Sequence, residues 1–275
     1  MTFLAVEAEP GEFPEIVLED LFEFPALLFD GTNFAFNRVG LLYLLAAAIV
    51  IWLMLAAFRR GKVVPGRFQA AMEALVDLVR NNIIIEVIGT RGLRYLPLLT
   101  AMFLFILVGN LFEITPLINM PANGRMAMPA FLAIMVWTVF IVAGLREHGI
   151  GYFKAALVPS GVPKPVLVLL IPIELVSTFI VRPLTLAVRL FANMMAGHIL
   201  VAVAFLATNA FLIDVGQGFT EPYFFPNGFG GAIIGVFTLA GSVALIAFEL
   251  LVSVLQAYIF TILTAVYISS SIEEH

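Results

Sequence analysis

The sequence contains no cysteine and few charged residues. Without cysteine there are no disulfides, no thiolate nucleophile and no cysteine-ligated metal site. Charged residues make up 12% of the 275, whereas an ordinary soluble domain has roughly a quarter. Hydrophobic residues make up 62%, and apolar runs recur along the whole chain. The composition therefore excludes a soluble globule and predicts several membrane spans.

Lysine and arginine are absent from the first 37 residues, which carry eight acidic residues. A secretory signal peptide begins with a basic region, so this segment does not resemble one. We expect residues 1–39 to form an acidic extracytoplasmic segment, and residues 40–275 to form a single membrane domain.

The sequence lacks the motifs of two common kinds of functional site, a zinc protease centre and a nucleotide-binding loop. The chain has three histidines and no HExxH pattern, which argues against a zinc protease. No glycine-rich phosphate loop is present, so we expect no direct binding of ATP. We likewise predict no cofactor, no metal and no nucleic-acid partner.

The positions of the basic residues predict the topology. A first span over about 40–58 ends at Arg59 and Arg60, and a third over about 129–145 ends at Arg146, with a second span over about 96–111 between them. Short basic loops stay in the cytoplasm, so we place the N-terminus outside and the C-terminus in the cytoplasm of a bacterial plasma (inner) membrane. Residues 67–88 are amphipathic with a helical period, which predicts an interfacial helix.

The last 110 residues contain two very long apolar runs, at about 164–213 and 229–271, separated by a loop without basic residues. A helix of about 45 residues is ~65 Å long, twice a hydrocarbon core of ~30 Å. We therefore predict an all-α polytopic membrane protein with about five spans plus the interfacial helix. Its last two helices should form a long, strongly tilted hairpin at about 164–271, with Pro183 a candidate bend. Two pairs of ordinary spans are the alternative, for which Pro183 offers the one turn signal.

Polar residues form a stripe along the first long helix. They recur every three or four residues, which places them on one face: Glu174, Thr178, Arg182, Thr185, Arg189 and Asn193. Ionisable groups within a span are costly and often mark ion paths. Arg189 lies deepest, and arginine keeps its proton, so it would act by holding a carboxylate ionised. The alternative is an ion pair within the chain, with Glu174 or Glu249.

The second long helix carries its own polar stripe, which includes Glu249, Ser253, Gln256 and Tyr267. In an antiparallel hairpin, the numbering places His198 level with Glu249, Arg189 with Gln256, and Glu174 with Tyr267. A histidine beside a carboxylate can relay protons near neutral pH, although a buried histidine is also often a structural group. These charges fit either a rotary stator or a proton-coupled secondary carrier; the lack of an internal repeat counts against a carrier.

Two segments resemble the signatures of subunit a of F-type ATP synthases. They are Pro-Leu-Thr-Leu-Ala-Val-Arg-Leu-Phe-Ala-Asn-Met-Met-Ala-Gly-His at 183–198 and Leu-Gln-Ala-Tyr-Ile-Phe at 255–260, continued by Leu-Thr-Ala-Val-Tyr at 263–267. The resemblance implies a non-catalytic, proton-conducting stator subunit with two offset half-channels, whose proton flow drives rotation and ATP synthesis. The partners it implies are a ring of c subunits, peripheral-stalk b-type subunits, membrane lipid and protons.

The resemblance also implies roles for individual residues. Arg189 matches the essential arginine between the half-channels. The implied proton path comprises outer positions at Asn193, His198, Glu249, Ser253 and Gln256, cytoplasmic positions at Glu174 and Tyr267, and weaker outer candidates at Glu113 and Asn110. In some members of the family the acid and the histidine occupy opposite helices from those here. The His198–Glu249 pair favours protons over sodium as the coupling ion.

Overall fold

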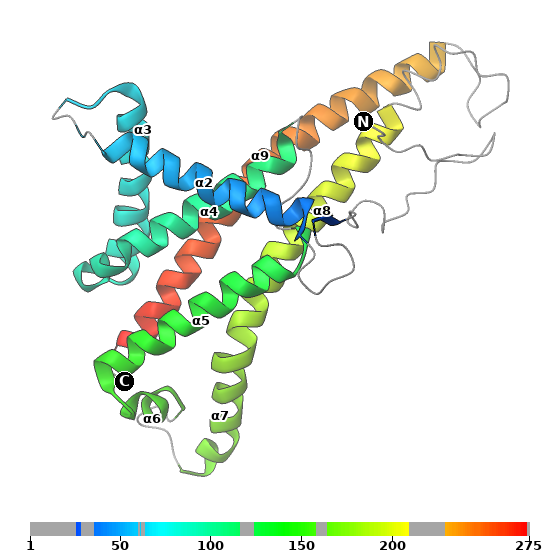
Figure 1. Ribbon diagram of the computed structural model, residues 1–275. Coiled ribbons are helices and arrows are strands. Elements are labelled where there is room, and N and C mark those ends of the chain that lie inside the picture. Colours follow the sequence, from blue (N-terminus) through cyan, green and yellow to red (C-terminus); the bar gives the residue numbers. More distant parts are fainter. Residues whose placement is uncertain are drawn as a thin grey trace. The chain divides into compact units, whose positions relative to one another are not determined.

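The computed structural model describes residues 26–28, 36–59, 61, 64–115, 124–157, 164–208 and 229–273 (Figure 1). Most of the acidic segment 1–39 and the loop 214–228 lie outside these residues. The helices are α2 (Arg38–Phe58), α3 (Arg67–Asp77), α4 (Leu96–Ile114), α5 (Ala127–His148), α6 (Gly151–Leu157), α7 (Lys164–Val176), α8 (Arg182–Thr208) and α9 (Phe229–Ile272). Three shorter helical segments are η1 (Leu78–Ile85, π), η2 (Thr90–Tyr95, 3₁₀) and η4 (Ser177–Val181, π).

Five helical stretches among the described residues are long and apolar enough to cross a membrane. They are Arg38–Phe58, Thr90–Ile114, Ala127–His148, Pro165–Thr208 and Ile233–Ile272. This confirms the predicted all-α polytopic membrane protein. One short exception is an antiparallel pair of strands, β1 (Ala26–Leu28) and β2 (Phe36–Asn37), directly before α2.

The last two stretches contain 44 and 40 residues and are not divided into pairs of ordinary spans. At ~1.5 Å per residue each is about 60 Å long or more, so a bilayer core of ~30 Å can contain them only if they are strongly tilted or bent. Figure 1 shows α7 and α8 running in different directions, with η4 between them. Pro183 explains this bend, because its ring has no N–H and clashes with the carbonyl four residues earlier, inside η4.

The predicted interfacial helix is α3 continued by η1. Met72, Val79 and Ile83 are buried on one face, while Asp77 and Arg80 are exposed on the other. The segment ends at Gly89, whose φ of 79° suits glycine, and whose N–H donates to the carbonyl of Ile84 at 3.0 Å.

The chain divides into two compact units. The small unit comprises Met1–Leu41 and Met195–Leu251, and the large unit comprises Leu42–Met194 and Val252–His275. The division passes through α8 and α9, so each unit contains part of both helices. The large unit holds the main hydrophobic core, in which Leu99, Phe103 and Ile106 of α4 are buried against neighbouring helices.

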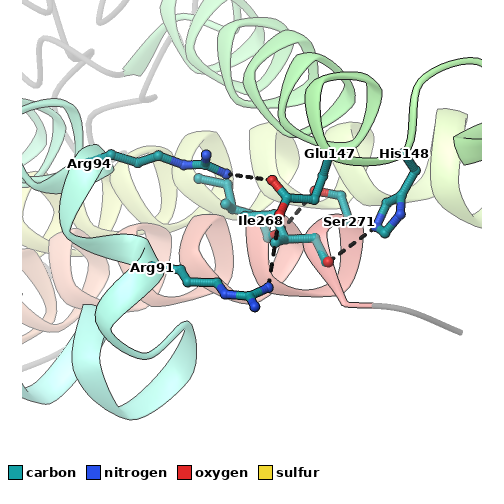
Figure 2. A network of polar contacts seen from close by, with 7 residues as sticks. Arg91, Arg94, Glu147, His148, Ile268 and Ser271 are labelled. Atoms are coloured by element: carbon teal, nitrogen blue, oxygen red, sulfur yellow. Dashed lines mark hydrogen bonds and ion pairs between the residues drawn. The ribbon is translucent and has the colours of Figure 1, made fainter.

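Polar contacts join the ends of several helices in the large unit (Figure 2). Glu147 of α5 forms ion pairs with Arg91 and Arg94 of η2, at 3.9 Å and 3.6 Å. His148 lies 3.2 Å through Nε2 from the carbonyl of Ile272, the last residue of α9. A hydrogen-bond donor at that position satisfies one of the carbonyls left open at a helix end. The network therefore fixes the end of α9 against α5.

Candidate functional site

Arg189 lies on a face of α8 that points away from the core of the large unit. Leu186, Ala187 and Leu190, on the side of α8 that faces the core, are buried. Arg189 is exposed, and its neighbours Leu184 and Val188 are exposed apolar side chains. Among the described residues of this unit, no hydrogen bond or ion pair reaches the guanidinium. Because an arginine is charged at any physiological pH, the described residues of this unit leave a positive charge on an apolar face without a counter-charge.

The expected alternative of an intrachain ion pair fails for Glu174. This residue is half-buried in α7, within the same unit as Arg189, and no ion pair joins the two. The stretch of helix between them is fifteen residues, or ~22 Å along the axis, which exceeds the reach of both side chains. Glu249, the other candidate, belongs to the small unit.

Asn193, one turn beyond Arg189, joins α8 to α9. Its Nδ2 donates a hydrogen bond to Oε1 of Gln256 at 2.7 Å. Gln256 is 1% exposed, and its own Nε2 has no hydrogen-bond partner among the described residues. The predicted level of Gln256 with Arg189 stays a prediction, because the hydrogen bond shows only that Gln256 lies within reach of a residue one turn beyond the arginine. The hydrogen bond between the two amides leaves the buried Nε2 of Gln256 available to donate to a further group near the arginine.

A second polar contact continues from α9 to α4. Nδ2 of Asn110 donates to the backbone carbonyl of Ser253 at 3.3 Å, and Asn110 is fully buried. Glu113, one turn along α4, is 3% exposed. Oγ of Ser253 is also buried without a hydrogen-bond partner among the described residues. Ser253 and Gln256 are three residues apart and share a face of α9. The buried Asn110, Ser253 and Gln256 and the half-buried Asn193 thus form a line of polar groups across the large unit.

Glu249 and His198 are both buried in the small unit. The carboxyl group of Glu249 occupies the space that a Cβ at Gly197 would need. Only glycine, which has no Cβ, allows the acid to lie so close to α8. Since Gly197 directly precedes His198, the predicted common level of His198 and Glu249 is confirmed. Oε1 of Glu249 has no hydrogen-bond partner among the described residues.

Tyr267 does not lie level with Glu174, so that prediction is wrong. Its ring lies under the guanidinium of Arg182, with 5.4 Å from Cζ to the ring centroid. Nη1 of Arg182 also donates to Oγ of Ser270 at 3.2 Å. Arg182 is eight residues after Glu174, a little over two turns. The sequence placed Arg182 in the polar stripe but gave no sign of this contact, because its partners lie 85 and 88 residues away.

Five apolar stretches long enough to span a membrane, which contain an exposed arginine and a line of polar groups one turn from it, are typical of an integral membrane protein that moves ions. The family model described as ATP synthase A chain matches residues 40–269. The ATP synthase subunit a of Rhodococcus erythropolis is 41% identical over 268 residues, covering 96% of this chain and 93% of the relative. The subunit a of Pseudarthrobacter chlorophenolicus is 38% identical over 279 residues, covering 99% and 98%. The subunit a of a Parafrankia species is 42% identical over 245 residues, covering 88% and 78%.

The chain therefore belongs to the ATP synthase subunit a family. It is an integral membrane protein of the membrane sector of that complex, and it takes part in proton transport and ATP synthesis. Membership of this family argues against the alternative interpretation of the chain as a proton-coupled secondary carrier.

Proposed function

We propose that this subunit is the stator that delivers protons to, and accepts them from, the carboxylates of a rotating ring of c subunits. The observation that carries the proposal is the guanidinium of Arg189, exposed on an apolar face without a partner among the described residues of its unit. A fixed cation in a membrane needs a counter-charge. Carboxylates that pass Arg189 in turn would supply one, and the arginine would hold each of them ionised and block a direct leak between two half-channels.

The line of polar groups supports an outer half-channel that ends beside Arg189. Its members lie on three helices. Two of them, Ser253 and Gln256, each have a buried polar side-chain atom that forms no hydrogen bond with a described residue. Such atoms can exchange hydrogen bonds with a moving proton carrier such as water. The assigned path contains Glu113, Asn110, Ser253, Gln256 and Asn193 in the large unit, and His198 with Glu249 in the small unit.

The inner half-channel would open on the side of Glu174 and Tyr267. Basic residues support a cytoplasmic location for that side: Arg59 follows α2, Arg67 begins α3, and Arg146 lies in the last turn of α5. This orientation leaves the N-terminus outside and the C-terminus in the cytoplasm of a bacterial plasma membrane. A single membrane domain would then extend over 40–275 behind the acidic segment 1–39.

The subunit would perform no bond-making chemistry itself. Its remaining partners would be peripheral-stalk b-type subunits, for which the amphipathic segment of α3 and η1 offers a polar face, and membrane lipid against the exposed leucines of α2. The coupling ion would be the proton, which the His198–Glu249 level supports over sodium.

The test is Arg189→Ala in the complete ATP synthase, assayed in membrane vesicles. We expect the complex to assemble and proton-driven ATP synthesis to fall below detection, because the exposed side chain contributes nothing to the core. Arg59→Ala, another exposed arginine, directly after α2, is the matched control and should retain synthesis. Normal synthesis by an assembled Arg189→Ala enzyme would refute the stator proposal.

A further inference from the structure

The guanidinium of Arg182 is held in place by contacts with another helix. It contacts the ring of Tyr267 and the hydroxyl of Ser270, both on α9. The ring of Tyr267 is itself held edge-on by Phe140 of α5, at 6.0 Å between centroids. A cation over an aromatic face is attracted by the ring quadrupole, most strongly where water is excluded. Three helices therefore fix the position of this one charge.

The charge of Arg182 is not neutralised within the large unit. Among the described residues of that unit, no carboxylate lies within ion-pair distance of it, whereas Arg91 and Arg94 share Glu147. Arg182 and Arg189 are seven residues apart, which places them on the same face of α8, ~10 Å apart along its axis. Arg182 lies on the side of Glu174 and Tyr267, where the proposed function puts the exit.

The field of Arg182 also reaches α6. Tyr152 is buried there, with its ring against the backbone of Gly144. Burial raises the pKa of Tyr152, and the positive charge of Arg182 partly opposes that rise. Among the described residues, the groups that interact with the guanidinium are thus the rings of Tyr267 and Tyr152 and the hydroxyl of Ser270. None of them cancels its charge.

We propose that Arg182 is a second electrostatic residue of the proton path: a fixed positive charge, held by Tyr267 and Ser270, that favours release of the proton from each ring carboxylate on the exit side. This inference rests on the proposed stator function. It assigns different tasks to the two arginines. Arg189 keeps the carboxylate ionised as it passes, whereas Arg182 promotes the ionisation that must come first.

The experiment measures proton-driven ATP synthesis by the complete enzyme in liposomes, as a function of pH on the side that synthesises ATP, at constant driving force. A unit charge at ~10 Å in an effective dielectric of ~20 shifts a carboxyl pKa by about one unit. The charge favours the carboxylate, so its removal raises the pKa at which the carboxyl releases its proton. Arg182→Gln should therefore move the acid limb of the profile up by about one pH unit. Arg182→Lys keeps the charge and should stay within a few tenths of a unit.

Two further variants separate the charge from packing. Tyr267→Phe keeps the ring that contacts the guanidinium and should leave the position of the acid limb unchanged, whatever its effect on the maximal rate, whereas Tyr267→Leu releases the guanidinium and should move the limb in the direction of Arg182→Gln. An unshifted profile for an assembled Arg182→Gln enzyme would overturn the inference, as would activity lowered equally at every pH. Should Arg182→Gln fail to assemble, Arg182→Met is measured in its place; failure of both would assign a structural role and also overturn it. The proposed function fails separately, through Arg189→Ala.

Discussion

Arg182 and Arg189 occupy the same face of one helix, two turns apart, and differ completely in their surroundings. Arg182 contacts an aromatic ring and a hydroxyl of α9. Arg189 is exposed among apolar side chains, and no described residue of its unit pairs with it. Both are cations in a span, where an unpaired charge is costly. The first has its interactions within the chain, whereas the described residues of its unit supply none for the second.

The other polar groups of the molecule likewise differ in whether they have interaction partners within the chain. Glu249 and Gln256 are buried and each keeps one polar atom without a hydrogen-bond partner among the described residues. Glu147 instead forms ion pairs with two arginines at the helix ends. We therefore expect the substitution of a polar group that lacks partners within the chain to affect mainly proton-driven synthesis. The substitution of a group that is well paired within the chain should affect mainly stability.

The largest difference is expected between lysine substitutions at the two arginines. Lysine is a compact, strongly hydrated charge whose pKa shifts readily on desolvation, and it lacks the planar fork of arginine. Arg189→Lys should lower proton-driven synthesis by at least ~10-fold, because a passing carboxylate requires a charge that stays fixed and protonated. Arg182→Lys should remain within ~2-fold, since an ammonium also binds an aromatic face. Rates of synthesis in vesicles, normalised to assembled enzyme, measure both, and equal losses would break the comparison.

An intermediate effect is expected at Gly197, where Glu249 approaches the backbone of α8. In Gly197→Ala the new Cβ would require the position of the carboxyl group, so the acid must move. Overpacking of this kind costs ~1–3 kcal/mol, which corresponds to roughly 5- to 150-fold if it falls on proton transfer. We expect several-fold slower proton-driven synthesis.

Two variants make the Gly197 result specific. Gly241→Ala, also in the small unit, introduces a Cβ with no atom within 4 Å, and it should leave synthesis unchanged. The double variant Gly197→Ala/Glu249→Asp shortens the acid by one methylene and should recover part of the loss. An unimpaired Gly197→Ala enzyme would show that the position of the carboxyl group is unimportant.

Much of the fold follows from the sequence because its signals are long and repeated. The spans and the long final helices are runs of apolar residues that a bilayer must contain, and the bend near Pro183 follows from a missing N–H. The stripe that contains Arg189 follows from helical spacing alone. The level of His198 with Glu249 also follows, because it lies near the loop and little error accumulates over so few turns.

Pairings further from the loop could not be predicted in the same way. Counting residues assumes two straight helices, whereas the π-helical segment η4 and the bend beside it separate α7 from α9. The expected level of Tyr267 with Glu174 is therefore wrong, because Tyr267 contacts Arg182 instead. The pairing of Asn110 with Ser253 depends on how α4 packs, which no local pattern records. Nor does spacing show which of two arginines on one face has a partner.

The smallest effect on proton-driven synthesis is expected where the charges are fully paired, at Glu147 (Figure 2). Its ion pairs with Arg91 and Arg94 span 3.9 Å and 3.6 Å, and the glutamate side chain is 33% exposed. Exposed pairs of this length contribute ~0–1 kcal/mol. Glu147→Gln should therefore lower the thermal midpoint of the assembled complex slightly and leave synthesis unchanged. The control is Glu86→Gln, because Glu86 is exposed and has no ion pair among the described residues. It should change neither the thermal midpoint nor synthesis. A Glu147→Gln enzyme that loses synthesis as Arg189→Ala does would mean that pairing within the chain does not separate structural charges from functional ones.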